Sequence, residues 1–183
     1  MQHNEWSIVK LKCFVRNGFD SSTLINLIVV FDSEFEEFRQ RGFTFPPHLF
    51  FYHEISRPEV IGVLTNRHKL TKEEAISSFE KLVSTFNLQK ITRNCELDEQ
   101  FERIVEEANS RVVLKLNNPH LKIGDNDIII IAGFLKSKIN VVHSGDEGFL
   151  KTCEELAMNT IPLSQLDVAK EEKLKEWLKK RKN

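Results

Sequence analysis

Short apolar runs and longer stretches with an amphipathic pattern follow one another along this chain of 183 residues. The short runs are rich in β-branched and aromatic residues, which is typical of strands. They lie at residues 11–15, 48–53, 89–92, 139–143 and 160–163. Pro162 cannot donate a ladder hydrogen bond, so we expect the last strand at an edge of its sheet. After the first run, Arg16, Asn17 and Gly18 predict a bend.

Between these runs, apolar residues recur every three or four positions, as they do on the buried face of a helix. The expected helices begin at or near Asp20, Pro58, Thr71, Leu97, Asp127 and Phe149. Gly42 is expected to end the first helix, whose apolar face includes Phe31 and Phe35. Thr71 and Glu74 have the spacing of a capping box. Residues 111–116 are apolar, and their pattern is ambiguous.

The stretch that begins at Asp127 could by itself form a helix or a strand. Four isoleucines follow Asp127, and β-branched residues favour sheets. Its length and its neighbours favour a helix, because an aspartate suits a helix start and Lys136 suits a last turn.

The alternation of strands and helices predicts an α/β protein with a mainly parallel sheet. We expect one domain over residues 1–163, because this length can bury a real core. Residues 164–183 are a charged C-terminal tail in which lysines outnumber acids, and we interpret it as a solvated terminal helix, with a basic finger or a partner contact as the alternative.

Composition excludes several classes of protein. A net charge of −1 predicts no strong overall field for nucleic acid, so any such binding needs a local patch. Three widely spaced cysteines argue against a disulfide framework. No apolar run is long enough for a membrane span, and the first residues lack the apolar core of a signal peptide. We therefore expect a cytoplasmic protein.

The stretch from Asp127 to Asp146 should bring two carboxylates together. About 12 helical residues travel roughly 18 Å, and about six strand residues travel roughly 20 Å back. Asp146, just past the strand, should therefore lie near Asp127. Like charges that close shift each other's pKa, and a divalent cation is the usual reason for such an arrangement.

Four acids lie at predicted strand-to-helix junctions, namely Asp20, Glu59, Asp127 and Asp146. In parallel sheets the ligand site lies beyond the carboxyl ends of the strands, so these acids should share one edge. Each alone could be only a helix cap. Together their oxygens fit a hard cation, Mg²⁺ or Mn²⁺. Asp125 competes with Asp127 for this role, and Glu54 competes with Glu59.

These acids and their neighbours resemble, in order, the motifs of the PIN-domain nucleases. The resemblance covers roughly residues 8 to 163. The matching segments are Asp20–Ile25, Pro58–Val60, Asp127–Ala132 and Ser144–Phe149. The chain departs from the family pattern at Gly148, where a second aspartate is often found, and at Gly18, which interrupts the first strand.

The resemblance implies a three-layer PIN-like fold, with helices flanking the sheet, and a metal-dependent endoribonuclease acting on single-stranded RNA. Asp20, Asp127 and Asp146 would hold Mg²⁺ or Mn²⁺, and Glu59 would complete the site or orient the water. Ser22 and Ser144 are expected to hydrogen-bond those carboxylates or the phosphate. The resemblance is also compatible with a toxin paired with an antitoxin and with a homodimer. The alternative is a catalytically weak PIN-like module that binds RNA or a protein.

Overall fold

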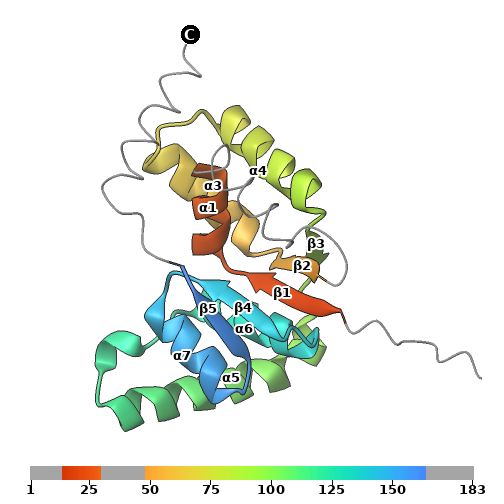
Figure 1. Ribbon diagram of the computed structural model, residues 1–183. Helices are drawn as coiled ribbons and strands as arrows, with labels where there is room; N and C mark the ends of the chain where they lie inside the picture. The colour runs from red at the N-terminus through yellow and green to blue at the C-terminus, as the bar shows by residue number, and fades with distance from the viewer. Residues whose placement is uncertain (1–13, 30–47, 164–183) are drawn as a thin grey trace, which may run out of the picture.

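A five-stranded parallel sheet forms the centre of the computed structural model, which describes residues 14–29 and 48–163 (Figure 1). The strands are β1 (Val15–Phe19), β2 (His48–His53), β3 (Gln89–Ile91), β4 (Val141–Ser144) and β5 (Asn159–Pro162). Their order in the sheet is β3-β2-β1-β4-β5, and every neighbouring pair is parallel. The sheet thus has β5 at one edge, as Pro162 predicts.

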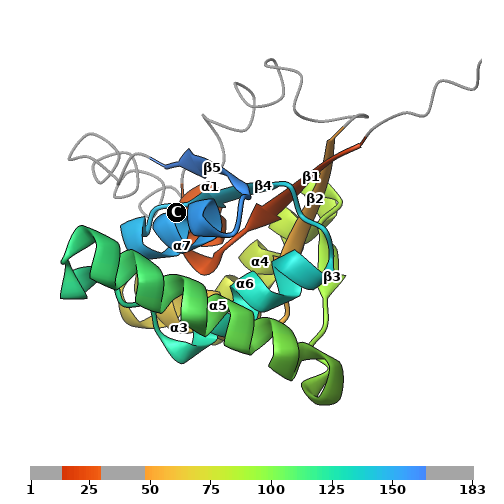
Figure 2. The same cartoon turned by 90° about the horizontal axis from the view of Figure 1, so that it is seen from below.

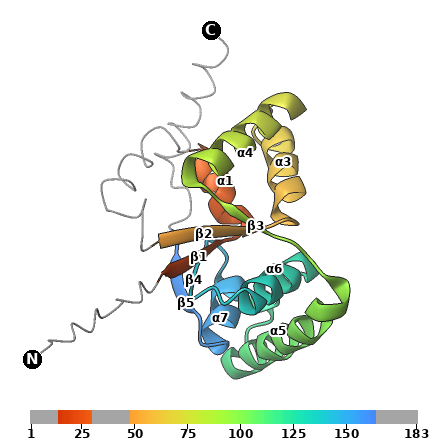
Figure 3. The ribbon, with the colours of Figure 1, turned by 90° about the vertical axis from the view of Figure 1, so that its right-hand side faces the viewer.

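Helices cover both faces of the sheet (Figures 1 and 3). One layer contains α1 (Ser21–Val29), α3 (Ser56–Asn66) and α4 (Lys72–Phe86). The other contains α5 (Cys95–Leu116), α6 (Asp125–Lys136) and α7 (Glu147–Glu155), with the short 3-10 turn η1 (Pro119–Leu121). The three-layer α/β fold is therefore confirmed. None of the helices within the described residues is long and apolar enough to cross a membrane.

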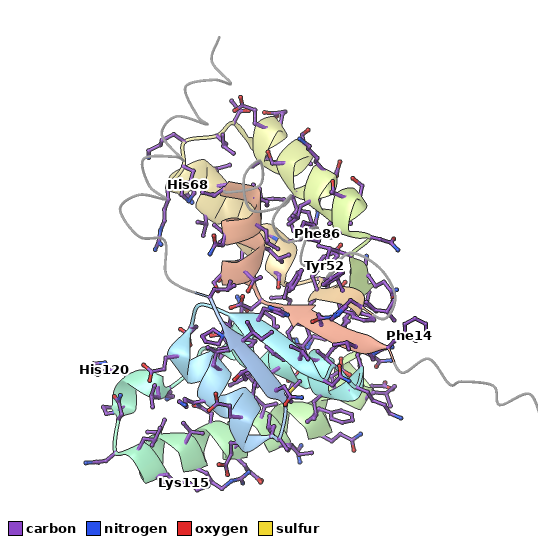
Figure 4. All side chains as sticks on the ribbon, in the orientation of Figure 1. Phe14, Tyr52, His68, Phe86, Lys115 and His120 are labelled. Atoms are coloured by element: carbon purple, nitrogen blue, oxygen red, sulfur yellow. The ribbon has the colours of Figure 1, made fainter. Side chains whose placement is uncertain are left out.

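Each face of the sheet has its own hydrophobic core. On the face covered by α1, α3 and α4, Phe19 packs against Phe50 and Phe86, and Tyr52 packs against Phe79. Tyr52 and Phe86 point into this layer (Figure 4). On the other face, the buried residues of α6 and α7 join those of β2 and β4. The alternation of side chains along each strand thus supplies both cores at once.

The bend predicted at residues 16–18 is wrong, because these residues continue β1. Gly18 lies in the strand under α6, where a Cβ atom would come 2.8 Å from the ring of Phe134. The glycine therefore permits close packing of helix on strand rather than a turn.

Two helix predictions also need correction. The ambiguous residues 111–116 continue the helix predicted from Leu97, so α5 is a single helix of 22 residues. Pro58 is the third residue of α3, which begins at Ser56 rather than at the proline. The capping box of Thr71 and Glu74 is confirmed at the start of α4. The predictions for Phe31, Phe35, Gly42 and the tail from residue 164 lie outside the described residues.

Candidate active site

The order in which the chain adds strands to the sheet changes direction between the neighbouring strands β1 and β4. From β1 it continues to β2 on one side, and from β4 to β5 on the other, while α1 and α7 cover opposite faces. In such sheets a crevice opens beyond the carboxyl ends of the two central strands. Asp20 directly follows β1, and Asp146 lies two residues past the end of β4.

Asp20 is the buried centre of a hydrogen-bond network at this crevice, with only 4% of its surface exposed. Its Oδ1 accepts the backbone N–H of Thr23 at 2.7 Å, and the Thr23 hydroxyl lies at the same distance. Its Oδ2 accepts the hydroxyl of Ser144 at 2.5 Å. The Ser22 hydroxyl lies 2.8 and 2.9 Å from the two carboxylate oxygens. Asp20 is thus a helix cap for α1 and a junction between β1 and β4.

Burial raises the pKa of Asp20, and the hydrogen bonds from Ser144, Thr23 and Ser22 act in the opposite direction. The donors therefore favour the carboxylate form inside the protein. We name Asp20, Ser22, Thr23 and Ser144 the fixed corner of the site.

The loop after β4 is tied to the start of α1 by backbone groups. The N–H of Gly145 donates to the Ser22 hydroxyl at 2.8 Å, and the N–H of Asp146 donates to the Ser144 hydroxyl at 2.9 Å. Both hydroxyls thus link a backbone amide to the Asp20 carboxylate. This arrangement fixes the position of Asp146 relative to Asp20.

Glu59, Asp127 and Asp146 surround the fixed corner, and we name them the open rim. Glu59 is exposed in the first turn of α3 and accepts the hydroxyl of Ser21 at 2.7 Å. Asp146 is exposed and caps α7, because its Oδ1 accepts the N–H of Phe149 at 2.7 Å.

Asp127 is half-buried in the first turn of α6, where its Oδ2 accepts the N–H of Gly124 at 3.2 Å. The pKa of Asp127 is raised to about 6, chiefly by burial and also by the charges of Asp146, Glu59 and Asp20, while the Gly124 amide acts in the opposite direction. The charges of the other three predicted acids therefore reach Asp127 at one edge of the sheet.

The donor set is chemically suited to a hard cation, because it consists of carboxylate and hydroxyl oxygens. Within residues 14–29 and 48–163, however, no group of three His, Cys, Asp or Glu side chains is arranged to hold a metal ion. Each carboxylate is instead held by an amide or a hydroxyl group of the protein.

The two competing acids lie differently. Glu54 accepts the backbone N–H of Arg93 at 2.7 Å and so closes the loop after β3. Asp125 is exposed at the first position of α6.

Sequence reasoning missed Thr23 and Ser21, which bind Asp20 and Glu59. Thr23 is three residues past the aspartate, and this capping distance was the available signal.

Close packing explains why a glycine stands at position 148. A Cβ atom at this position would come 2.7 Å from the carbonyl oxygen of Leu121 in η1. An aspartate there would therefore force α7 away from η1. The absence of the second acid follows from this close approach.

Among the solved structures that resemble this protein, two cover most of the chain. VapBC2 from Rickettsia felis, bound to a DNA fragment from the promoter, matches with a TM-score of 0.53 and 14% identity, over 81% of this chain and 99% of that chain. VapBC-1 from nontypeable Haemophilus influenzae matches with a TM-score of 0.53 and 17% identity, over 80% and 97%. VapC is a PIN-domain protein. This protein has a PIN-domain fold.

No protein-family model matches the sequence, and no curated protein matches it either. At identities of 14% and 17%, the structural likeness establishes the fold alone. Any activity therefore has to be argued from the site that the chain's own residues build.

Proposed function

We propose that this PIN-domain protein is an endoribonuclease that hydrolyses single-stranded RNA with Mg²⁺ or Mn²⁺. The observation that carries the proposal is the position of Asp127, half-buried at one sheet edge within the field of three other acids; burial first and these charges second raise its pKa. Burial of like charges together costs free energy, and a divalent cation would offset that cost.

The chain's own residues would divide the work. The fixed corner holds the Asp20 carboxylate in one orientation, so it would be the rigid ligand. Asp127 and Asp146 would turn toward the cation, since Asp146 is exposed and Asp127 is held by one long hydrogen bond. Glu59 would complete the site or orient the attacking water. A bound cation supplies a water of lowered pKa and stabilises the leaving oxygen.

The proposed setting is a cytoplasmic protein that acts as a toxin or in RNA processing. The names of the two similar structures support the toxin setting, because VapBC complexes are toxin–antitoxin pairs. A protein antitoxin would then be the natural partner.

A second candidate function is a catalytically weak module that binds RNA or a protein. Two observations favour it, namely the full use of Asp20 in internal hydrogen bonds and the lack of three acids arranged for a metal among the described residues.

The deciding experiment follows cleavage of a labelled single-stranded RNA with Mn²⁺ by the full chain. Asp127→Asn keeps the shape and removes the charge, so cleavage should fall at least a hundredfold, on the order of the loss of one metal ligand. Asp125→Asn is the matched control, because it removes an exposed acid two positions earlier on the same helix, and it should cleave like the parent.

Metal binding is measured separately by calorimetric titration of Mn²⁺ into each protein. The enzyme predicts binding to the parent and to Asp125→Asn, with weak binding to Asp127→Asn. The binding module predicts RNA affinity that is unchanged by a chelator, with no cleavage in any variant. Equal traces of cleavage in all three proteins would indicate contamination and reject the enzyme.

A further inference from the structure

The loop from Leu121 to Gly124, which we name the rim loop, lies beside two acids of the open rim. A Cβ atom at Gly148 would come 2.7 Å from the Leu121 carbonyl oxygen and 3.3 Å from Oδ1 of Asp146, so this carbonyl and this carboxylate are near neighbours. At the other end of the loop, the N–H of Gly124 donates to Oδ2 of Asp127 at 3.2 Å. The rim loop therefore runs from beside Asp146 to Asp127.

One buried amide group fixes the backbone of the rim loop from inside the protein. The side-chain nitrogen of Asn109 in α5 donates to the Leu121 carbonyl oxygen at 2.9 Å, and the side-chain oxygen accepts the N–H of Ile123 at 3.4 Å. Asn109 is buried and also donates to the Thr152 hydroxyl in α7 at 2.9 Å. Figure 2 shows α5 lying across α6 and α7. The loop is thus held relative to both helices that begin at the rim.

Lys122 is the charged residue of the rim loop, and its side chain is turned to solvent. Burial alternates along the loop, because Leu121 and Ile123 are buried while Lys122 between them is exposed. The backbone at Lys122 is extended, with φ −70° and ψ 120°, so neighbouring side chains point to opposite sides. Figure 4 shows His120, two positions earlier, at the outer surface of the molecule. Among the described residues, no acid lies within ion-pair distance of the Lys122 ammonium group.

The crevice needs a positive group if RNA is to enter it. Four carboxylates carry more negative charge than one divalent cation neutralises, so a phosphate group would still meet repulsion. The first two turns of α1 and α6 contain no Lys or Arg. In the first two turns of α3 and α7, Arg57 is paired with Glu80 at 3.4 Å and Lys151 with Glu154 at 2.9 Å. Lys122 is therefore the unpaired cation that the fold holds beside these acids.

We propose that Lys122 is a further substrate-binding residue of the site, and that its ammonium group binds a backbone phosphate of RNA crossing the rim between Asp127 and Asp146. This inference rests on the proposed function, because it takes single-stranded RNA as the ligand. A phosphate contact carries no base information, so Lys122 contributes affinity and placement of the strand rather than a choice of sequence. Asn109 is then a positioning residue, which acts by fixing the loop that carries Lys122.

The first measurement is the affinity of the full chain for a short fluorescein-labelled single-stranded RNA, by fluorescence anisotropy in a chelator at several salt concentrations. Lys122→Gln should weaken binding about tenfold, because it removes one charge-assisted hydrogen bond. It should also reduce the slope of log affinity against log salt by about 0.7, the value for one phosphate contact on a single strand. Lys122→Arg keeps the charge and should bind like the parent.

Lys138→Gln is the matched control for the loss of one positive charge. Lys138 is exposed like Lys122, but it follows the last turn of α6, at the opposite end of that helix from Asp127. The control should bind RNA with the affinity and the salt slope of the parent.

Cleavage in Mn²⁺ distinguishes a phosphate contact from a disturbed rim. Lys122→Gln should raise KM about tenfold and leave kcat within about twofold of the parent, because the contact is equally strong before and during the reaction. Its affinity for Mn²⁺ in calorimetry should not fall, because Lys122 supplies no ligand, whereas a distorted rim would bind Mn²⁺ more weakly. Thermal unfolding should also match the parent, since the side chain is exposed.

The outcomes distinguish this contact from the proposed function. If the parent cleaves RNA and Lys122→Gln binds and cleaves it equally well, the contact is wrong and the enzyme stands. If the parent binds RNA without cleavage and Lys122→Gln alone weakens that binding, the contact stands and the enzyme is rejected. Equal weakening by Lys122→Gln and Lys138→Gln, no recovery in Lys122→Arg, or a parent that binds no RNA would each overturn the contact.

Discussion

The fixed corner and the open rim both contain carboxylates, but the surroundings of these carboxylates differ. Asp20 is almost completely buried and holds hydrogen bonds from three side chains, so it connects β1, α1 and β4. Asp127 is half-buried with one amide partner, and its burial together with the charges around it opposes its ionisation. The corner therefore stabilises the fold through its hydrogen bonds, while the carboxylate form of Asp127 in the rim is unfavourable until a cation or a positive ligand offsets its charge.

This difference means that the loss of an acid should lower stability strongly at the fixed corner and hardly change it at the open rim. Both acids belong to the proposed catalytic set, so activity alone cannot distinguish them. Measuring the free energy of unfolding as well as the activity of each variant distinguishes the structural acid, Asp20, from the proposed ligand-binding acid, Asp127.

The largest effect is expected for Asp20→Ala. It leaves the hydroxyls and an amide of the fixed corner without their acceptor, and the free energy of unfolding should fall by about 3 kcal/mol. Asp127→Ala should change it by no more than about 0.5 kcal/mol at pH 7. Urea unfolding followed by circular dichroism measures both. Equal losses in the two variants would remove the distinction between corner and rim.

Gly148→Ala should lower the free energy of unfolding by about 2 kcal/mol, because the new methyl group meets the Leu121 carbonyl oxygen at 2.7 Å. The control is Gly62→Ala in α3, where nothing lies within 4 Å of the added atom. That change should stabilise the helix by up to about 1 kcal/mol. The melting temperature should therefore fall in Gly148→Ala and rise in Gly62→Ala. If Gly148→Ala left the melting temperature unchanged, the rim could accept a further acid at this position.

Ser144→Ala should cost about 1.5 kcal/mol, since it removes one donor to Asp20 and the acceptor of the Asp146 amide. Cleavage should also decrease, because Asp146 loses its anchor. Thr160→Ala, at a partly exposed hydroxyl on β5 whose partner is Glu154, is a control for loss of a surface hydroxyl. If the two variants behaved alike, the corner would have no special role.

The smallest effect concerns pH. The pKa of Asp127 rises from 3.8 to about 6 on folding, so its contribution to stability is fully present below about pH 4 and is lost as the pH rises through 6. Asp127→Asn does not titrate. Its stability relative to the parent should therefore increase by about 1 kcal/mol between pH 4 and pH 7, after allowance for solvent screening.

This difference should be measured in a chelator and again with Mn²⁺. In the chelator, the free energy of unfolding of Asp127→Asn should increase relative to that of the parent as the pH rises. With Mn²⁺ at pH 7 the parent should recover and exceed the variant, because binding to the folded state stabilises it. A difference that stays constant from pH 4 to pH 7 would show that folding does not raise the pKa of Asp127.

Local signals in the sequence were sufficient for much of the fold. The run 48–53 forms β2, the capping box at Thr71 begins α4, and Pro162 lies on the edge strand. These features depend on neighbours within a few residues, so pattern and propensity can identify them. The ordered acids likewise predicted one shared edge, because parallel strands place their carboxyl ends together.

Contacts between distant residues were beyond the reach of such patterns. Gly18 looked like a turn residue because its reason, the ring of Phe134, is 116 positions away in the chain. The long α5 looked interrupted because its buried face depends on α6 and α7. Ser22 and Ser144 were expected to bind carboxylates, but only the packed loops show that both bind Asp20 and that Thr23 completes the set.

The sequence by itself therefore determined the alternation of strands and helices and the parallel sheet, and it provided four acids as a candidate site. Only the tertiary structure decided which acid is buried and hydrogen-bonded and which is exposed to the repulsion of its neighbours. The physical reason is that burial and electrostatic fields depend on distances through space, and the chain creates those distances only when β1 and β4 come to lie side by side.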